Sequence, residues 1–137
     1  MVKHNFLHPQ EIEVYYVIPA LRRQLAIAMK KNGLKQKKIA ELLHIEDATV
    51  SQYINKKRGN KVSFIPQVQK EITKAAKTIT DDLSLLKEMQ HLLRQIKQTE
   101  NICIIHKQLS KIPQECSPER INCFGGESYA KLHLGSK

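Results

Sequence analysis

Three cysteines and one histidine near the C-terminal end of the sequence have side chains that bind transition metals. Cys103 and His106 are three residues apart, so a helix would present both on one face. Cys116 and Cys123 follow in a segment without helical periodicity, which would deliver two further sulfur ligands. Thiolates and imidazole suit zinc or an iron–sulfur cluster, so a metal centre is one interpretation of this set. Ordinary buried or unused thiols are the alternative, since the spacings match no standard zinc module.

Basic residues form the second group with a chemical use. Residues 1 to 70 contain 13 Lys and Arg against 5 Asp and Glu, whereas residues 71 to 137 contain 10 against 8. Most of the net charge of +10 therefore lies in the first half, where it favours binding to phosphate backbones. An anionic membrane surface would attract the same charge. A basic surface with no partner other than water is the third interpretation.

The composition indicates that helices must position these residues. The chain has no Trp, only 5 Gly and 5 Pro, and is rich in Lys, Gln, Leu, Ile and Ala, so we expect an all-α fold. The apolar spacing predicts a short helical piece and then a longer helix from Pro19 to about Asn32. Gly33 follows directly and suits a left-handed helix C-cap.

Two short helices are predicted next. The first runs from Lys35 to Leu43 and has an apolar stripe that we expect to be buried. Residues 44–46 form a tight turn. The second begins near Asp47, whose carboxylate suits an N-terminal cap, and runs to about Lys56. The buried stripe of the first short helix is expected to consist of Ile39, Ala40, Leu42 and Leu43.

A longer apolar stripe occupies the second half of the chain. One helix is predicted from Pro66 to about Thr80, and a second from there to about Thr99 or beyond. Thr80, Asp81 and Asp82 separate the two helices and cap the second. The stripe either packs back on the first half or forms a two-fold dimer, and we favour the dimer. The expected organisation is a first domain at 1–65, a helical dimerisation or partner region at 66–110 and an irregular tail at 111–137.

The segment from Leu34 to Ile54 contains, in order, Gln36, Ala40, Ile45, Val50, Ser51 and Tyr53. At these positions it resembles the helix-turn-helix of the lambda-repressor-like family of transcriptional regulators. Most members of that family have Gly at the position of His44, because the backbone there takes a positive φ, which His tolerates better than branched residues do. A small residue is needed where the two helices cross, and apolar residues hold the turn and the second helix against the first.

The resemblance implies that the second short helix enters the major groove of double-stranded DNA. The side chains then expected to meet base edges are Asp47, Ala48, Thr49 and Gln52. Other residues would contact the phosphate backbone without reading sequence. These backbone contacts are Gln36, Lys37, Ser51, Asn55, Lys56, Lys57, Arg58 and Lys61. Such proteins usually bind paired half-sites, so a homodimer is expected.

The whole chain is similar, more loosely, to a group of predicted prokaryotic and mainly archaeal regulators with a Cys-bearing C-terminal tail. The resemblance rests on the stretch ICIIHKQL and on Glu115-Cys116. Glu119 stands where those proteins carry a further Cys, which leaves Cys123. In such a protein, removal of a metal ligand would alter the dimer and with it the affinity for DNA.

Other classes of protein are less consistent with the sequence. There is no Gly-rich phosphate loop, nucleophile motif or close carboxylate pair, so we do not expect an enzyme. The N-terminus does not resemble a secretory signal, and the longest apolar run, Val14 to Leu21, is far below the ~20 residues of a membrane span. A cytoplasmic location is expected. The alternative function is an antitoxin-like or adaptor protein that holds a protein partner through its C-terminal helices.

Overall fold

The computed structural model describes residues 6–55, 62–121 and 123, and these residues form helices and connecting segments without a strand. This confirms the all-α prediction for the described part of the chain. None of the helices in it is long and apolar enough to cross a membrane. The helical elements are α1 (Pro9–Ile12), the π-helical turn η1 (Glu13–Val17), α2 (Ile18–Lys31), α3 (Gln36–Leu43), α4 (Asp47–Ile54), α5 (Pro66–Thr78), α6 (Asp82–Gln98), α7 (Asn101–Leu109) and α8 (Pro118–Ile121).

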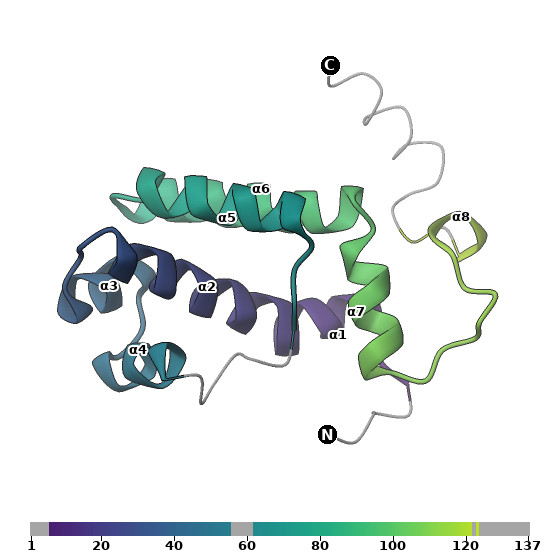
Figure 1. Ribbon diagram of the computed structural model, residues 1–137. Coiled ribbons are helices and arrows are strands. Elements are labelled where there is room, and N and C mark those ends of the chain that lie inside the picture. Colours follow the sequence, from purple (N-terminus) through teal and green to yellow (C-terminus); the bar gives the residue numbers. More distant parts are fainter. Residues whose placement is uncertain (1–5, 56–61, 122, 124–137) are drawn as a thin grey trace, which may run out of the picture.

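The central element is α2, which contacts α3 and α4 on one side and α5 on another. Figure 1 shows α5 and α6 lying side by side along α2, with α3 and α4 at one end of the molecule and α1, α7 and α8 at the other. One apolar cluster fills the space between these elements and includes residues from both halves of the chain. Its fully buried members include Leu21, Leu25, Ile39, Val50 and Ile72.

A continuous helical path runs from Pro9 to Lys31, although Pro19 lies within it. The expected helix from Pro19 to Asn32 is within one residue of α2, but the chain before it is not broken. Instead, η1 adopts a π-helical turn in which the Ile18 N–H donates to the carbonyl of Glu13, five residues earlier. This wider turn accommodates the proline, which has no N–H to donate and whose ring would collide with the preceding turn of a regular helix.

The end of α2 follows the predicted pattern. Gly33 has a φ of 93°, in the left-handed region that a C-cap glycine supplies. Its N–H donates to the Lys30 carbonyl over 3.0 Å, and the Leu34 N–H donates to the Met29 carbonyl over 3.1 Å. These two bonds satisfy the last carbonyls of the helix in the Schellman arrangement. The chain therefore turns sharply into α3.

The hairpin of α5 and α6 determines where the apolar stripe of the second half of the chain packs. The predicted start at Pro66 is confirmed, and α6 starts at Asp82 with Asp81 as its N-cap. The Ser84 N–H donates to the Asp81 carboxylate over 2.8 Å, while the Ser84 hydroxyl accepts from the Asp81 N–H. The chain therefore reverses at residues 79–81, and α5 packs against both α2 and α6. Of the two interpretations, packing back on the first half accounts for the stripe of α5.

Candidate functional site

The turn between α3 and α4 contains the backbone geometry that the sequence predicted. His44 ends α3 in the left-handed conformation, with φ 55° and ψ 46°. The Ile45 N–H then donates to the carbonyl of Ala40 over 3.0 Å, which closes the turn. Ala40 is buried in α3, as are Ile39, Leu42 and Leu43, so the predicted stripe is confirmed. The short turn holds the two helices in direct contact.

The residues of α4 divide into a buried and an outward face. Val50 is fully buried and Tyr53 is 2% exposed, and both belong to the apolar cluster that includes α2. Gln52 is exposed and Thr49 is partly exposed, as the major-groove interpretation requires. Asp47, Ala48 and Asn55 are also exposed, and Ser51 is partly exposed. The two anchors therefore fix α4 so that its polar residues face outward.

The first turn of α4 corrects one detail of the prediction. Glu46, rather than Asp47, occupies the N-cap position, and its side chain makes no capping hydrogen bond. Asp47 is the first helical residue, where its negative charge still suits the positive end of the helix dipole. The backbone carbonyl of Asp47 accepts a hydrogen bond of 3.0 Å from Gln36 Nε2. Gln36 therefore ties the start of α3 to the start of α4.

The residue before Gln36 is a lysine that the sequence pattern did not single out. Lys35 is the N-cap residue of α3 and is exposed, directly before Gln36. Lys35 therefore lies beside the hydrogen bond that links α3 to α4. Lys37, which was predicted to contact the phosphate backbone, is also exposed and follows Gln36. The adjacency of Lys35 to Gln36 in the sequence was the available signal. Four of the predicted backbone contacts, Lys56, Lys57, Arg58 and Lys61, lie outside the described residues.

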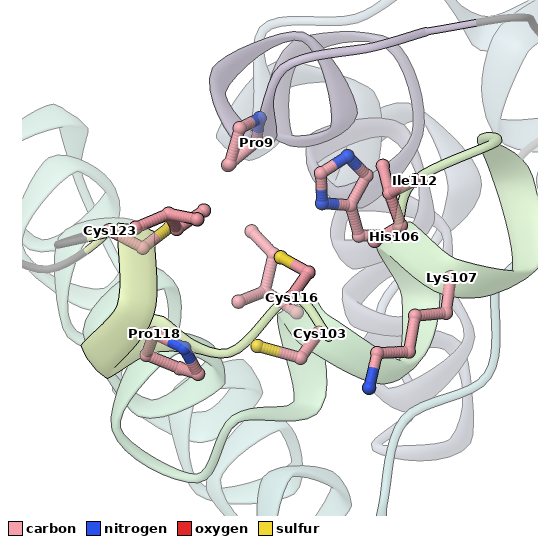
Figure 2. Close-up of a pocket in the computed structure, with 10 residues that line it drawn as sticks. Pro9, Cys103, His106, Lys107, Ile112, Cys116, Pro118 and Cys123 are labelled. Carbon is pink, nitrogen blue, oxygen red and sulfur yellow. The ribbon is translucent and has the colours of Figure 1, made fainter. Parts of the chain in front are cut away.

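The four predicted metal ligands are brought together at the opposite end of the molecule. Cys103 and His106 are on α7, Cys116 is in the segment after it, and Cys123 follows α8. All four line one cavity of about 20 Å³, and Figure 2 shows them arranged around it with Pro9 and Pro118. A space of this size holds about one water molecule or ion.

The present arrangement does not form a complete ligand shell. Within the described residues, no group of three or more His, Cys, Asp or Glu side chains is arranged so that it could hold a metal ion. The Nε2 of His106 is used in a hydrogen bond to the Leu7 carbonyl. Burial, with a smaller contribution from Glu100, raises the pKa of Cys103 to about 11, and burial also raises the pKa of Cys123. Burial therefore disfavours the thiolate form of both cysteines, and the metal centre stays a prediction from the sequence.

Comparisons of the chain with protein families, with curated proteins and with solved structures find no match. The proposal of a function therefore depends on the residues and geometry described above.

Proposed function

We propose that the protein is a sequence-specific regulator of transcription that binds double-stranded DNA and reads the major groove with α4. The observation that carries the proposal is the orientation of α4, which Val50 and Tyr53 anchor in the core while Ala48 and Gln52 remain exposed. An exposed, polar helix that follows a tight turn is the element that helix-turn-helix proteins insert into the groove.

The chemistry of the exposed residues indicates which of them would contact bases and which would contact phosphates. Gln52 has the amide that can pair with adenine through two hydrogen bonds, and Ala48 and Thr49 have methyl groups that can contact thymine. Lys35 and Lys37 flank the joint of the two helices, where cations would meet phosphates. The excess of basic residues in the first half of the chain supplies long-range attraction to DNA.

Exposed leucines on α6 favour a second component of the proposal, a homodimer. Leu83 is 76% exposed and Leu86 is 62% exposed, and they lie three residues apart on one face of the helix. Two copies of the chain would place two α4 helices on paired half-sites. The same surface also suits a different protein partner, which is the alternative function of an antitoxin-like or adaptor protein.

The test is selection of bound sequences from a pool of random duplexes by the full chain. We expect a two-fold symmetric motif with half-sites about one helical turn apart. Gln52→Ala should lower the preference for the selected base at one position of each half-site by about tenfold. The matched control is Gln108→Ala, an exposed glutamine on α7, which should leave the motif unchanged. Failure to enrich any sequence over random competitor would overturn the proposal.

A further inference from the structure

A second cavity lies at the end of the molecule opposite α3 and α4, beside the small cavity lined by the three cysteines and His106. Its volume is about 360 Å³, which is at the lower end of the range of about 300–1,000 Å³ for small-molecule sites. Three segments bound it: residues 6–9, His106 of α7 and the segment 112–121. The interior is lined mainly by Phe6, Leu7, Pro9, Ile112, Pro113 and Ile121.

One wall of this pocket is held in place by hydrogen bonds. The Leu7 N–H donates to the Ser110 hydroxyl over 2.8 Å, and the Leu7 carbonyl accepts from His106 Nε2. Both backbone groups of Leu7 are therefore fixed against α7 and the residue after it. A wall that needs no rearrangement lowers the entropic cost of binding a ligand.

The apolar lining is incompletely covered by the protein itself. Phe6 is 62% exposed and Ile121 is 51% exposed, and both line the pocket. A ligand with an apolar group would remove this surface from water, at a gain of about 25 cal/mol for each Å² buried.

Two opposite charges define the polar part of the ligand. Arg120 and Glu115 both line the pocket and are both exposed. Neither forms a salt bridge with another residue in the described part of the chain. A ligand with only a carboxylate would meet the repulsion of Glu115, and a ligand with only an ammonium group would meet that of Arg120. A zwitterion satisfies both charges.

We propose that this pocket binds a free α-amino acid with an apolar side chain. The side chain would lie among Phe6, Ile112 and Ile121, the carboxylate would bind Arg120, and the ammonium group would bind Glu115. Amino-acid binding at this pocket does not depend on the proposed function.

The experiment is calorimetric titration of the full chain with L-leucine and L-phenylalanine. We expect saturable binding of both. For leucine, the analogues that lack one charge, 3-methylbutylamine and 4-methylpentanoate, should bind at least about tenfold more weakly, since each is without one charge-assisted hydrogen bond. L-serine, which has both charges but no apolar side chain, should not bind measurably.

Charge-removing variants locate the site. Arg120→Gln and Glu115→Gln should each weaken leucine binding at least about tenfold. The matched controls are Lys111→Gln and Glu119→Gln, exposed neighbours that do not line the pocket, and these should bind like the unaltered chain. Circular dichroism checks that all four variants fold. Binding of the amine or the carboxylate as tightly as leucine, equal weakening in the controls, or no binding of any amino acid would overturn the proposal. Because the titration contains no DNA, its result is independent of whether the chain binds a duplex.

Discussion

His44 combines a strained backbone with an exposed side chain, which makes it a sharp test of the turn at the scale of one residue. Its left-handed φ of 55° costs a non-glycine residue about 1–2 kcal/mol, while glycine has an entropic cost of about 0.5–1 kcal/mol. Replacing His44 with Gly should therefore raise the free energy of unfolding by roughly 0.5 kcal/mol, and His44→Val should lower it by more than about 1 kcal/mol. Urea denaturation measures both.

The side chain of His44 needs a separate control. Its Nε2 donates to Asp82 Oδ1 over 2.6 Å, and both side chains are largely exposed. Exposed pairs of this kind contribute little, so Asp82→Asn should change the free energy of unfolding by less than about 1 kcal/mol. Greater destabilisation by His44→Gly than by His44→Val would show that the backbone of the turn is not left-handed in solution.

Glu71 joins α5 to α6 and makes the hairpin sensitive to pH. Its carboxylate accepts a hydrogen bond of 2.8 Å from His91 Nε2. This bond, with a smaller contribution from Lys74, holds the pKa of Glu71 below its ordinary value of 4.5, although burial opposes the shift. A pKa lowered by folding adds stability that is present above the ordinary value and is lost as the pH falls through the folded value.

Replacement of Glu71 by Gln should remove that pH dependence. We expect Glu71→Gln to lower stability at about pH 6 and to reduce the steepness of the decline below about pH 4.5. Denaturant titrations over this range provide the measurement. Glu88→Gln on α6 is the control, because no ion pair of Glu88 is found in the described structure. An identical pH profile for Glu71→Gln and the unaltered chain would contradict the assignment.

Local signals in the sequence predicted the helices up to residue 98 well. They predicted neither the break before α7 nor α8, which lies in the segment expected to be irregular, and they did not show how the helices pack. Pro66, Gly33 and Asp81 mark ends that depend on neighbouring residues alone, and each lies at or beside the predicted boundary. The π-helical turn before Pro19 was not predicted, because it depends on how the chain continues across the proline. The apolar stripe did not indicate whether it packs on α2 or on a second copy, because burial in either place requires the same spacing.

The candidate site was predictable to a similar extent. The sequence pattern placed Val50 and Tyr53 inside and Gln52 outside, because helical periodicity determines the faces of α4. The hydrogen bond from Gln36 to the Asp47 carbonyl joins residues 11 apart and follows from the angle between two helices, which local pattern does not specify. For the same reason, the sequence did not reveal the apolar pocket.

Association of two chains is a prediction about the whole molecule. If Leu83 and Leu86 form the interface between two copies, the double variant Leu83→Glu/Leu86→Glu should be monomeric, because four buried carboxylates would face one another across the two-fold axis. Light scattering during size-exclusion chromatography gives the mass. The control Ile104→Glu changes a residue of α7 that is 50% exposed and should leave the dimer intact. A monomeric unaltered chain would exclude this interface.

The distribution of charge over the whole molecule predicts how salt affects DNA binding. Each cation that binds a phosphate releases counterions, so the slope of log affinity against log salt concentration changes by about 0.9 for each such cation that is neutralised. Neutralising Lys56, Lys57 and Arg58 together should therefore flatten the slope by about two to three units while the preferred sequence stays the same.

The matched control for this charge change is the triple variant Lys74→Gln/Lys77→Gln/Lys87→Gln, which removes the same charge from exposed positions on α5 and α6. It should leave the slope nearly unchanged, because these cations are not beside α4 in the proposed complex. Fluorescence anisotropy with the selected duplex at several salt concentrations distinguishes the two variants. Equal flattening by both would mean that net charge alone attracts DNA, and an unchanged slope in the first would remove residues 56–58 from the interface.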